Sequence, residues 1–137
     1  MIYAGYDLAF ATGPSGAIGY VDGIVAAVPD GARADFVEHS QGRAAIFLEK
    51  GATRVVEGWG ADVPAGKITD FQRAVQAKAG ETVVCGWIEW PDKSTRDAGM
   101  TALMQDERLR ANPAPWNGQL AIFGGFTPIL DTDNTAS

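Results

Sequence analysis

The sequence is poor in the residues that build disulfides and zinc centres, because Cys85 is its only cysteine and His39 its only histidine. One cysteine excludes an intrachain disulfide, and a Cys/His zinc site needs three or four ligands. Neither a metal nor a cofactor is predicted; a metal would have to sit on carboxylates or bridge subunits. Since the cysteine usage does not point to an oxidising compartment, the cytoplasm is the expected location.

Long apolar runs and positive charge are also scarce. No segment approaches the roughly 18 uninterrupted apolar residues of a membrane span, and the first nineteen residues lack the basic start of a secretory signal. Lys and Arg number 11 against 17 Asp and Glu, which gives a net charge of −6. Because affinity for nucleic acids comes largely from Lys and Arg neutralising phosphates, we expect no nucleic-acid partner. Because no apolar segment is long enough to span a membrane, we expect no membrane partner either.

What remains is the composition of one globular domain, with 137 residues of which 46% are hydrophobic and 20% charged. We expect the domain to span residues 20–131, after a loosely ordered leader at 1–19 and before a polar tail at 132–137. The alternating apolar residues of the leader, such as Tyr6 and Leu8, leave open an added edge strand.

Segments rich in β-branched and aromatic residues alternate with segments whose apolar residues recur at helical spacing. Four strands are predicted at 20–28, 53–59, 81–91 and 119–130, and two helices at 34–50 and 94–110. Gly51 is placed to cap the first helix, and Ser94 with Asp97 resembles a capping arrangement for the second. Residues 67–80 are ambiguous: a helix capped by Thr69 or Asp70 fits, and a hairpin strand, which we favour, fits as well.

The repeated order strand, helix, strand predicts an α+β fold of the ferredoxin-like βαββαβ type. In this fold the antiparallel sheet has the strand order four, one, three, two, and both helices cover one face. The other face would then expose more apolar surface than soluble monomers usually leave uncovered. The simplest cover is the same face of a second copy, so the expected partner is the chain itself, as a homodimer.

Several segments carry a resemblance to a known family: YVDG at 20–23, RVVEGWGADVP at 54–64, ETVVCGWIEWP at 81–91, RDAGM at 96–100 and FGGFTPIL at 123–130. Over residues 20–131 the chain resembles the YbaA-like bacterial family, a domain family of unknown function. The resemblance implies a dimeric α/β barrel, a fold that also serves monooxygenases, isomerases and haem enzymes. Cys85 and Gly86 replace the Phe-Ser pair usual in the family, and this smaller pair is expected to widen any cavity that the strand lines.

Three carboxylates stand inside predicted strands, namely Asp22, Glu57 and Glu89. Charged residues seldom face a covered surface of a sheet unless they are paired. If side-chain alternation places all three on one face, they approach one another and raise one another's pKa, which suits general acid/base catalysis. The alternative is that they point to solvent or pair with an arginine such as Arg54, Arg73 or Arg96.

Aromatic residues concentrate in the same strands, and Trp59, Trp87 and Trp90 could wall a pocket for a flat organic ligand. Core or interface packing explains these tryptophans equally well. Cys85, in the middle of a strand, is expected to be a small buried hydrophobe rather than a reactive thiolate.

His39 is expected on the side of its helix away from Phe36 and Phe47, solvated or partly packed, and it stays a candidate ligand contact because histidine titrates near neutral pH. The leading hypothesis is a homodimer that binds a small organic ligand, with acid/base catalysis left open. One alternative is a non-enzymatic interaction or regulatory domain. Another, by fold analogy alone, is cofactor-assisted monooxygenase or haem chemistry, in which His39 would turn inward as an axial ligand.

Overall fold

A five-stranded antiparallel sheet forms the centre of the structure, a computed structural model that describes residues 1–132. Its strands are β1 (Gly5–Thr12), β2 (Tyr20–Pro29), β3 (Arg54–Asp62), β4 (Glu81–Trp90) and β5 (Ile122–Phe126). They lie side by side in the order β1-β3-β4-β2-β5. The four strands predicted from the sequence therefore occur in the predicted order, with β1 added at the edge next to β3.

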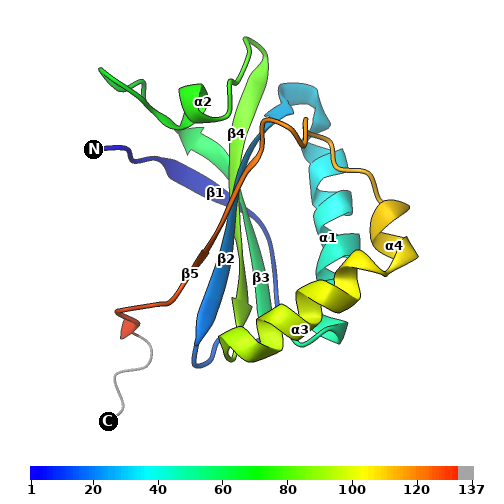
Figure 1. The fold of residues 1–137 in the computed structure, drawn as a ribbon. Helices are drawn as coiled ribbons and strands as arrows, with labels where there is room; N and C mark the ends of the chain where they lie inside the picture. The colour runs from blue at the N-terminus through cyan, green and yellow to red at the C-terminus, as the bar shows by residue number, and fades with distance from the viewer. Residues whose placement is uncertain (133–137) are drawn as a thin grey trace.

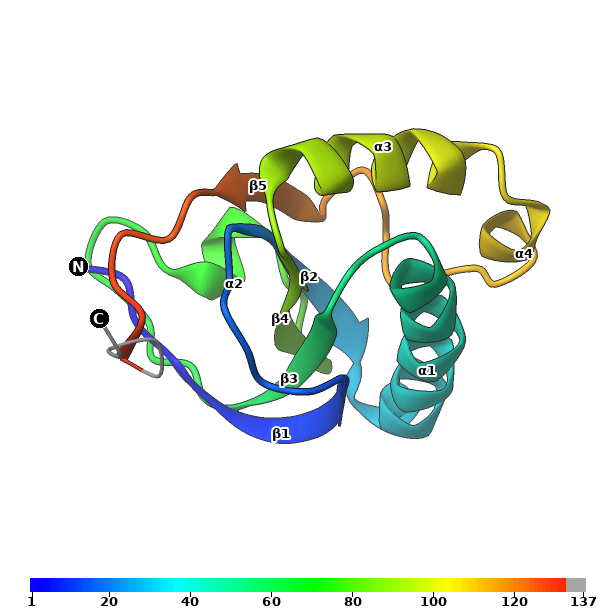
Figure 2. The ribbon, with the colours of Figure 1, turned by 90° about the horizontal axis from the view of Figure 1, so that it is seen from below.

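Three helices lie on one side of the sheet, as Figures 1 and 2 show. They are α1 (Arg33–Glu49), α3 (Lys93–Met104) and α4 (Glu107–Arg110). The prediction that Gly51 ends the first helix is confirmed, because this glycine adopts a φ of 108° just after α1. None of the helices in residues 1–132 is long and apolar enough to cross a membrane.

The hydrophobic core fills the space between these helices and the sheet. One cluster joins Phe47 of α1 and Leu103 of α3 to Trp90 of β4, and a second joins Phe36 of α1 to Trp59 of β3. Because side chains alternate along a strand, the residues between these core positions point to the opposite side, which we call the open face. Within residues 1–132, the open face carries only the short helix α2 (Phe71–Ala74) and connecting segments.

The segment expected as a loosely ordered leader contributes a strand. Residues Gly5–Thr12 form β1, which pairs with β3 over seven residue pairs and has two register shifts. Phe10 packs against the core, and the Tyr6 ring contacts Phe71 of α2 with centroids 6.3 Å apart. The edge-strand alternative is thus the arrangement in the structure. Of the expected polar tail at 132–137, all but Thr132 lies outside the described residues.

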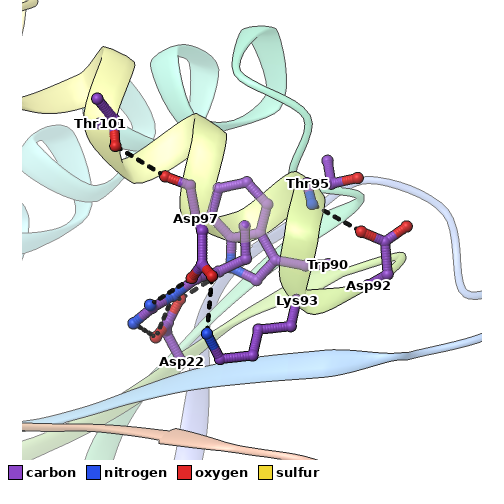
Figure 3. Close-up of polar contacts among 8 residues, drawn as sticks. Asp22, Trp90, Asp92, Lys93, Thr95, Asp97 and Thr101 are labelled. Carbon is purple, nitrogen blue, oxygen red and sulfur yellow. Dashed lines mark hydrogen bonds and ion pairs between the residues drawn. The ribbon is translucent and has the colours of Figure 1, made fainter.

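Four other predictions about the elements are corrected. Within residues 67–80 the chain forms the short helix α2 at Phe71–Ala74 and not the favoured hairpin strand, because the Asp70 carboxylate caps a turn by accepting from the Arg73 backbone N–H at 2.7 Å. The second predicted helix, at 94–110, divides into α3 and α4. Asp92, not Ser94, caps α3 by accepting from the Thr95 N–H at 2.6 Å (Figure 3). The last strand is shorter than predicted and covers Ile122–Phe126.

Candidate functional site

The three strand carboxylates do not share a face. Asp22 is paired with Arg96 of α3 and Glu57 with Arg43 of α1, so both acids face the helices. Glu89 instead accepts from the indole N–H of Trp87, two residues away on the same strand and therefore on the same side of it. The condition for all three to converge, a shared face, is not met by Glu89, because alternation in β4 turns it to the open face.

The Arg43–Glu57 pair is buried between α1 and β3. Glu57 is 1% exposed and Arg43 7% exposed, and the guanidinium donates from Nη2 to the Glu57 carboxylate. Burial raises the pKa of Glu57, and the charge and hydrogen bond of Arg43 oppose this increase without cancelling it. The carboxylate lies over Gly86, where an added Cβ would overlap it. Gly86 therefore makes room for Glu57 at this point of the sheet.

Asp22 has more partners than Glu57. It accepts from Arg96 Nε at 2.9 Å and from Arg96 Nη2 at 2.7 Å, and from the Trp90 indole N–H at 2.9 Å (Figure 3). Arg96 also donates to Asp97 at 3.0 Å. This bidentate geometry is the strong form of an arginine–carboxylate contact. The pairing alternative for Asp22 is thus the arrangement in the structure.

One cavity lies between the sheet and the helices α1 and α3, lined by Asp22 and Arg96 from one ion pair and by Arg43 alone from the other. Its volume is about 270 Å³, and Asp22, Arg43 and Arg96 supply its charged wall. Apolar residues and glycines supply the rest of the lining: Gly23, Ile24, Phe47, Ile88, Met100, Phe123, Gly124 and Gly125. Mostly apolar walls with a few polar groups are the usual lining of a small-molecule site. We therefore take this cavity as the candidate functional site.

His39 lies inside the molecule, contrary to the prediction that it stands on the side of its helix away from Phe36 and Phe47. It follows Phe36 by three residues, which places both on the same side of the helix, and it is 7% exposed. The ring packs edge-on against Trp116 with centroids 5.0 Å apart, and Nδ1 lies 3.0 Å from the Asn112 side-chain oxygen. Burial, followed by the charge of Arg43, lowers the pKa of His39.

Only one of the three predicted wall tryptophans approaches the cavity. Trp90 is buried beside it and holds Asp22. Trp59 packs in the other core cluster, with its ring centroid 5.7 Å from that of Phe36. Trp87 faces the opposite side of the sheet and is 40% exposed.

A second hollow lies on the open face, where β1 crosses beside β3 and β4. It measures about 220 Å³ and is lined by Tyr6, Asp7, Leu8, Val56, Gly58, Cys85 and Trp87. Burial, followed by the charge of Glu57, raises the pKa of Cys85, so its thiol is held in the unreactive form. Burial raises the pKa of Tyr6 to about 12, with a smaller contribution from Cys85.

Sequence reasoning missed Arg43, which lines the cavity and pairs with Glu57. The signal was its position: it follows Phe36 by seven residues and His39 by four, so a charged residue stands on the apolar side of the helix. The predicted absence of a metal centre stays a prediction, although residues 1–132 hold no group of three or more His, Cys, Asp or Glu side chains arranged to bind a metal ion.

Comparison with known proteins places the chain in a family. The family described as "Protein of unknown function (DUF1428)" matches residues 19–118, and the chain belongs to it. Among its relatives is the Uncharacterized protein YbaA of Escherichia coli strain K12, which is 45% identical over 114 residues, 82% of this chain and 97% of that protein. The Uncharacterized protein YbaA of Shigella flexneri matches with the same identity and coverage. The matched residues include α1, β3, β4 and α3, whereas β1 and β5 lie outside 19–118.

Proposed function

We propose that this protein is a homodimer that binds a small organic ligand in the cavity between the sheet and the helices α1 and α3. The observation that carries the proposal is the lining of that cavity, in which the charged groups Asp22, Arg43 and Arg96 meet apolar walls. A lining of this kind supports ligand binding rather than the alternative of an interaction domain with a packed interior. The proposal keeps the cytoplasmic location expected from the sequence.

Within this proposal Glu57 is the acid/base candidate. It does not line the cavity but meets it through Arg43, its one hydrogen-bonding side chain among the described residues, and burial raises its pKa above the ordinary carboxyl value, the direction that suits proton exchange. Asp22 is held by several strong donors and serves as a fixed wall. Glu89 belongs to the opposite face, so it takes no part at this cavity.

The dimer in this proposal forms through the open face, with two ferredoxin-like sheets face to face in a dimeric α/β barrel. Large apolar side chains on that face support it: Leu8 is 67% exposed, Ile122 44% and Phe126 62%. Register places Ile122 opposite Val25 and Phe126 opposite Val21 on the β2–β5 pair. An apolar surface of this extent on a free monomer favours burial against a partner.

Two phenylalanines of β5 allow both parts of the proposal to be tested with matched variants. Phe123 lines the cavity and Phe126 lies on the open face, and their exposures are similar at 65% and 62%. Light scattering should give a dimer for the native chain and for Phe123→Glu, and a monomer for Phe126→Glu. A monomeric native chain in dilute buffer would overturn the dimer.

An unbiased screen of metabolites by thermal shift tests ligand binding. We expect at least one compound to raise the melting temperature of the native protein and of Phe126→Ala, and to raise that of Phe123→Ala much less. The proposal fails if no compound shifts the melting temperature and Glu57→Gln only stabilises the fold.

A further inference from the structure

We infer that the ligand of the cavity is a compact organic anion, a monocarboxylate with a ring-sized apolar body, whose carboxylate pairs with Arg43 while Glu57 takes up a proton. This inference rests on the proposed ligand-binding function and names the chemical class of the ligand. It follows from a difference between the two ion pairs that contribute residues to the cavity lining.

Arg43 keeps donors without partners. Its guanidinium has five N–H groups, and among the described residues its one hydrogen-bonding partner is Glu57, reached from Nη2. The Nε group is buried without a partner. A buried, uncommitted N–H of a charged group is costly, and a carboxylate satisfies two neighbouring N–H groups of a guanidinium at once. A ligand carboxylate therefore offers what this side chain lacks.

The other ion pair has no such spare capacity. Arg96 uses Nε and Nη2 on Asp22 and Nη1 on Asp97. Asp22 in turn accepts from Trp90 as well. Because both members of this pair are already engaged, Arg43 is the charged group in the cavity lining that keeps donors without partners.

The apolar walls of the cavity determine the chemical character and the size of the rest of the ligand. Apolar side chains from three elements face the space, among them Phe47 of α1, Ile24 of β2 and Met100 of α3. A cavity of about 150 Å³ holds benzene, and drug-sized ligands occupy about 300–1,000 Å³. At about 270 Å³ the space fits a ring with a short acidic side group.

Charge balance requires that Glu57 takes up a proton when the ligand carboxylate binds. Arg43 is the charged group that acts on Glu57 from α1, with His39 one turn before it on the same helix. β4 contributes Cys85, whose thiol is held protonated, and the Asp22–Arg96 pair is neutral as a unit. A ligand carboxylate would thus leave two negative charges on one buried guanidinium. Two carboxylates that share a buried site raise one another's pKa, so one proton is retained.

Benzoate and its neutral analogue benzamide are the probes that test the inference. The readout is the methyl signal of Met100 in protein labelled with 13C at the methionine methyl groups. Benzoate should move the Met100 signal and bind at least about tenfold more tightly than benzamide, which corresponds to about 1.4 kcal/mol. Arg43→Met should abolish this preference, and Arg108→Met, which alters an exposed ion pair with Glu49, should leave it unchanged.

Calorimetry in two buffers of different ionisation enthalpy measures the proton. We expect the native protein to take up close to one proton on binding benzoate at neutral pH, and Glu57→Gln to take up none. This measurement needs no change at Arg43, so it decides the inference even if Arg43→Met does not fold.

The outcomes separate the inference from the proposed function. Equal binding of benzoate and benzamide at Met100 would overturn the inference and leave ligand binding intact. Benzoate binding with no proton uptake, or with equal uptake by Glu57→Gln, would overturn it as well. If neither probe moves Met100 at millimolar concentration the inference fails, and the wider metabolite screen alone decides whether the cavity binds another class of ligand.

Discussion

The carboxylate of Glu57 occupies the place where a side chain at residue 86 would lie, so a larger residue than Gly86 would have to displace this carboxylate at the centre of the β3–β4 pair. The two residues stand directly opposite each other in the register of these strands. A glycine here makes room for a charged side chain under the helices, and it holds the carboxylate within reach of Arg43 on α1.

Gly86→Ala should destabilise the protein. The new methyl group would overlap the Glu57 carboxylate and lie 2.9 Å from the Val56 carbonyl oxygen. Overpacking of this kind costs about 1–3 kcal/mol, measured as a lower free energy of unfolding in urea. Gly118→Ala is the matched control, because a Cβ there meets no atom within 4 Å. Equal stability of the two variants would contradict the packing described for Glu57.

Asp22→Asn should also destabilise the fold. The change removes the charge that holds Arg96 and weakens an acceptor that Trp90 uses, and loss of partners by buried donors costs about 1–3 kcal/mol. Asp97→Asn serves as the control, because Asp97 lies on the exposed side of α3 and surface ion pairs contribute little. Urea unfolding of both variants compares them, and similar midpoints would count against Asp22 as a fixed wall of the cavity.

His39 should make stability depend on pH on the acid side of neutrality. Its pKa is lowered in the folded protein, so its contribution is complete above the unfolded value of about 6.5 and is lost as pH falls through the lowered folded value. We expect the free energy of unfolding to fall more steeply below about pH 6.5 in the native protein than in His39→Gln. Parallel profiles of the two proteins would show that His39 is not buried as described.

Glu57 should make stability depend on pH in the direction opposite to that of His39. Its pKa is raised in the folded protein, so its contribution is fully present below the unfolded carboxyl pKa of about 4.3 and is lost as pH rises through the raised folded value. Relative to Glu57→Gln, the native protein should therefore lose stability with rising pH above about 4.3. Urea unfolding over that range measures the difference. A native protein that gains stability over this range would mean that Arg43 outweighs burial.

Periodicity predicted most of the strands and α1, because long β-branched runs and an apolar helical stripe leave few alternatives. It failed at 67–80, where a four-residue helix depends on one capping carboxylate, Asp70, and not on any repeat of apolar residues. It also placed residues 1–19 outside the domain, since an edge strand buries little and has a weak pattern.

The site was predicted only in part. The sequence singles out Asp22 and Glu57, and the structure places Asp22 in the cavity lining, whereas Glu57 meets the cavity only through its partner Arg43. Alternation decides the face of each residue, and the starting phase of β4, which a sequence does not fix, sends Glu89 to the other side. His39 was placed on the wrong side because its spacing of three from Phe36 was not applied.

The most direct test of the central claim, that the cavity binds a small molecule, uses the three methionines of the chain. Met100 lines the cavity, whereas Met104 is 76% exposed on α3 and Met1 is fully exposed at the start of the chain. In a screen of metabolites by 13C-methyl NMR, the account predicts a compound that shifts the Met100 signal in a saturable way and leaves Met104 and Met1 in place. If no compound shifts Met100, or if it moves only together with the two exposed methionines, the cavity is not a ligand site.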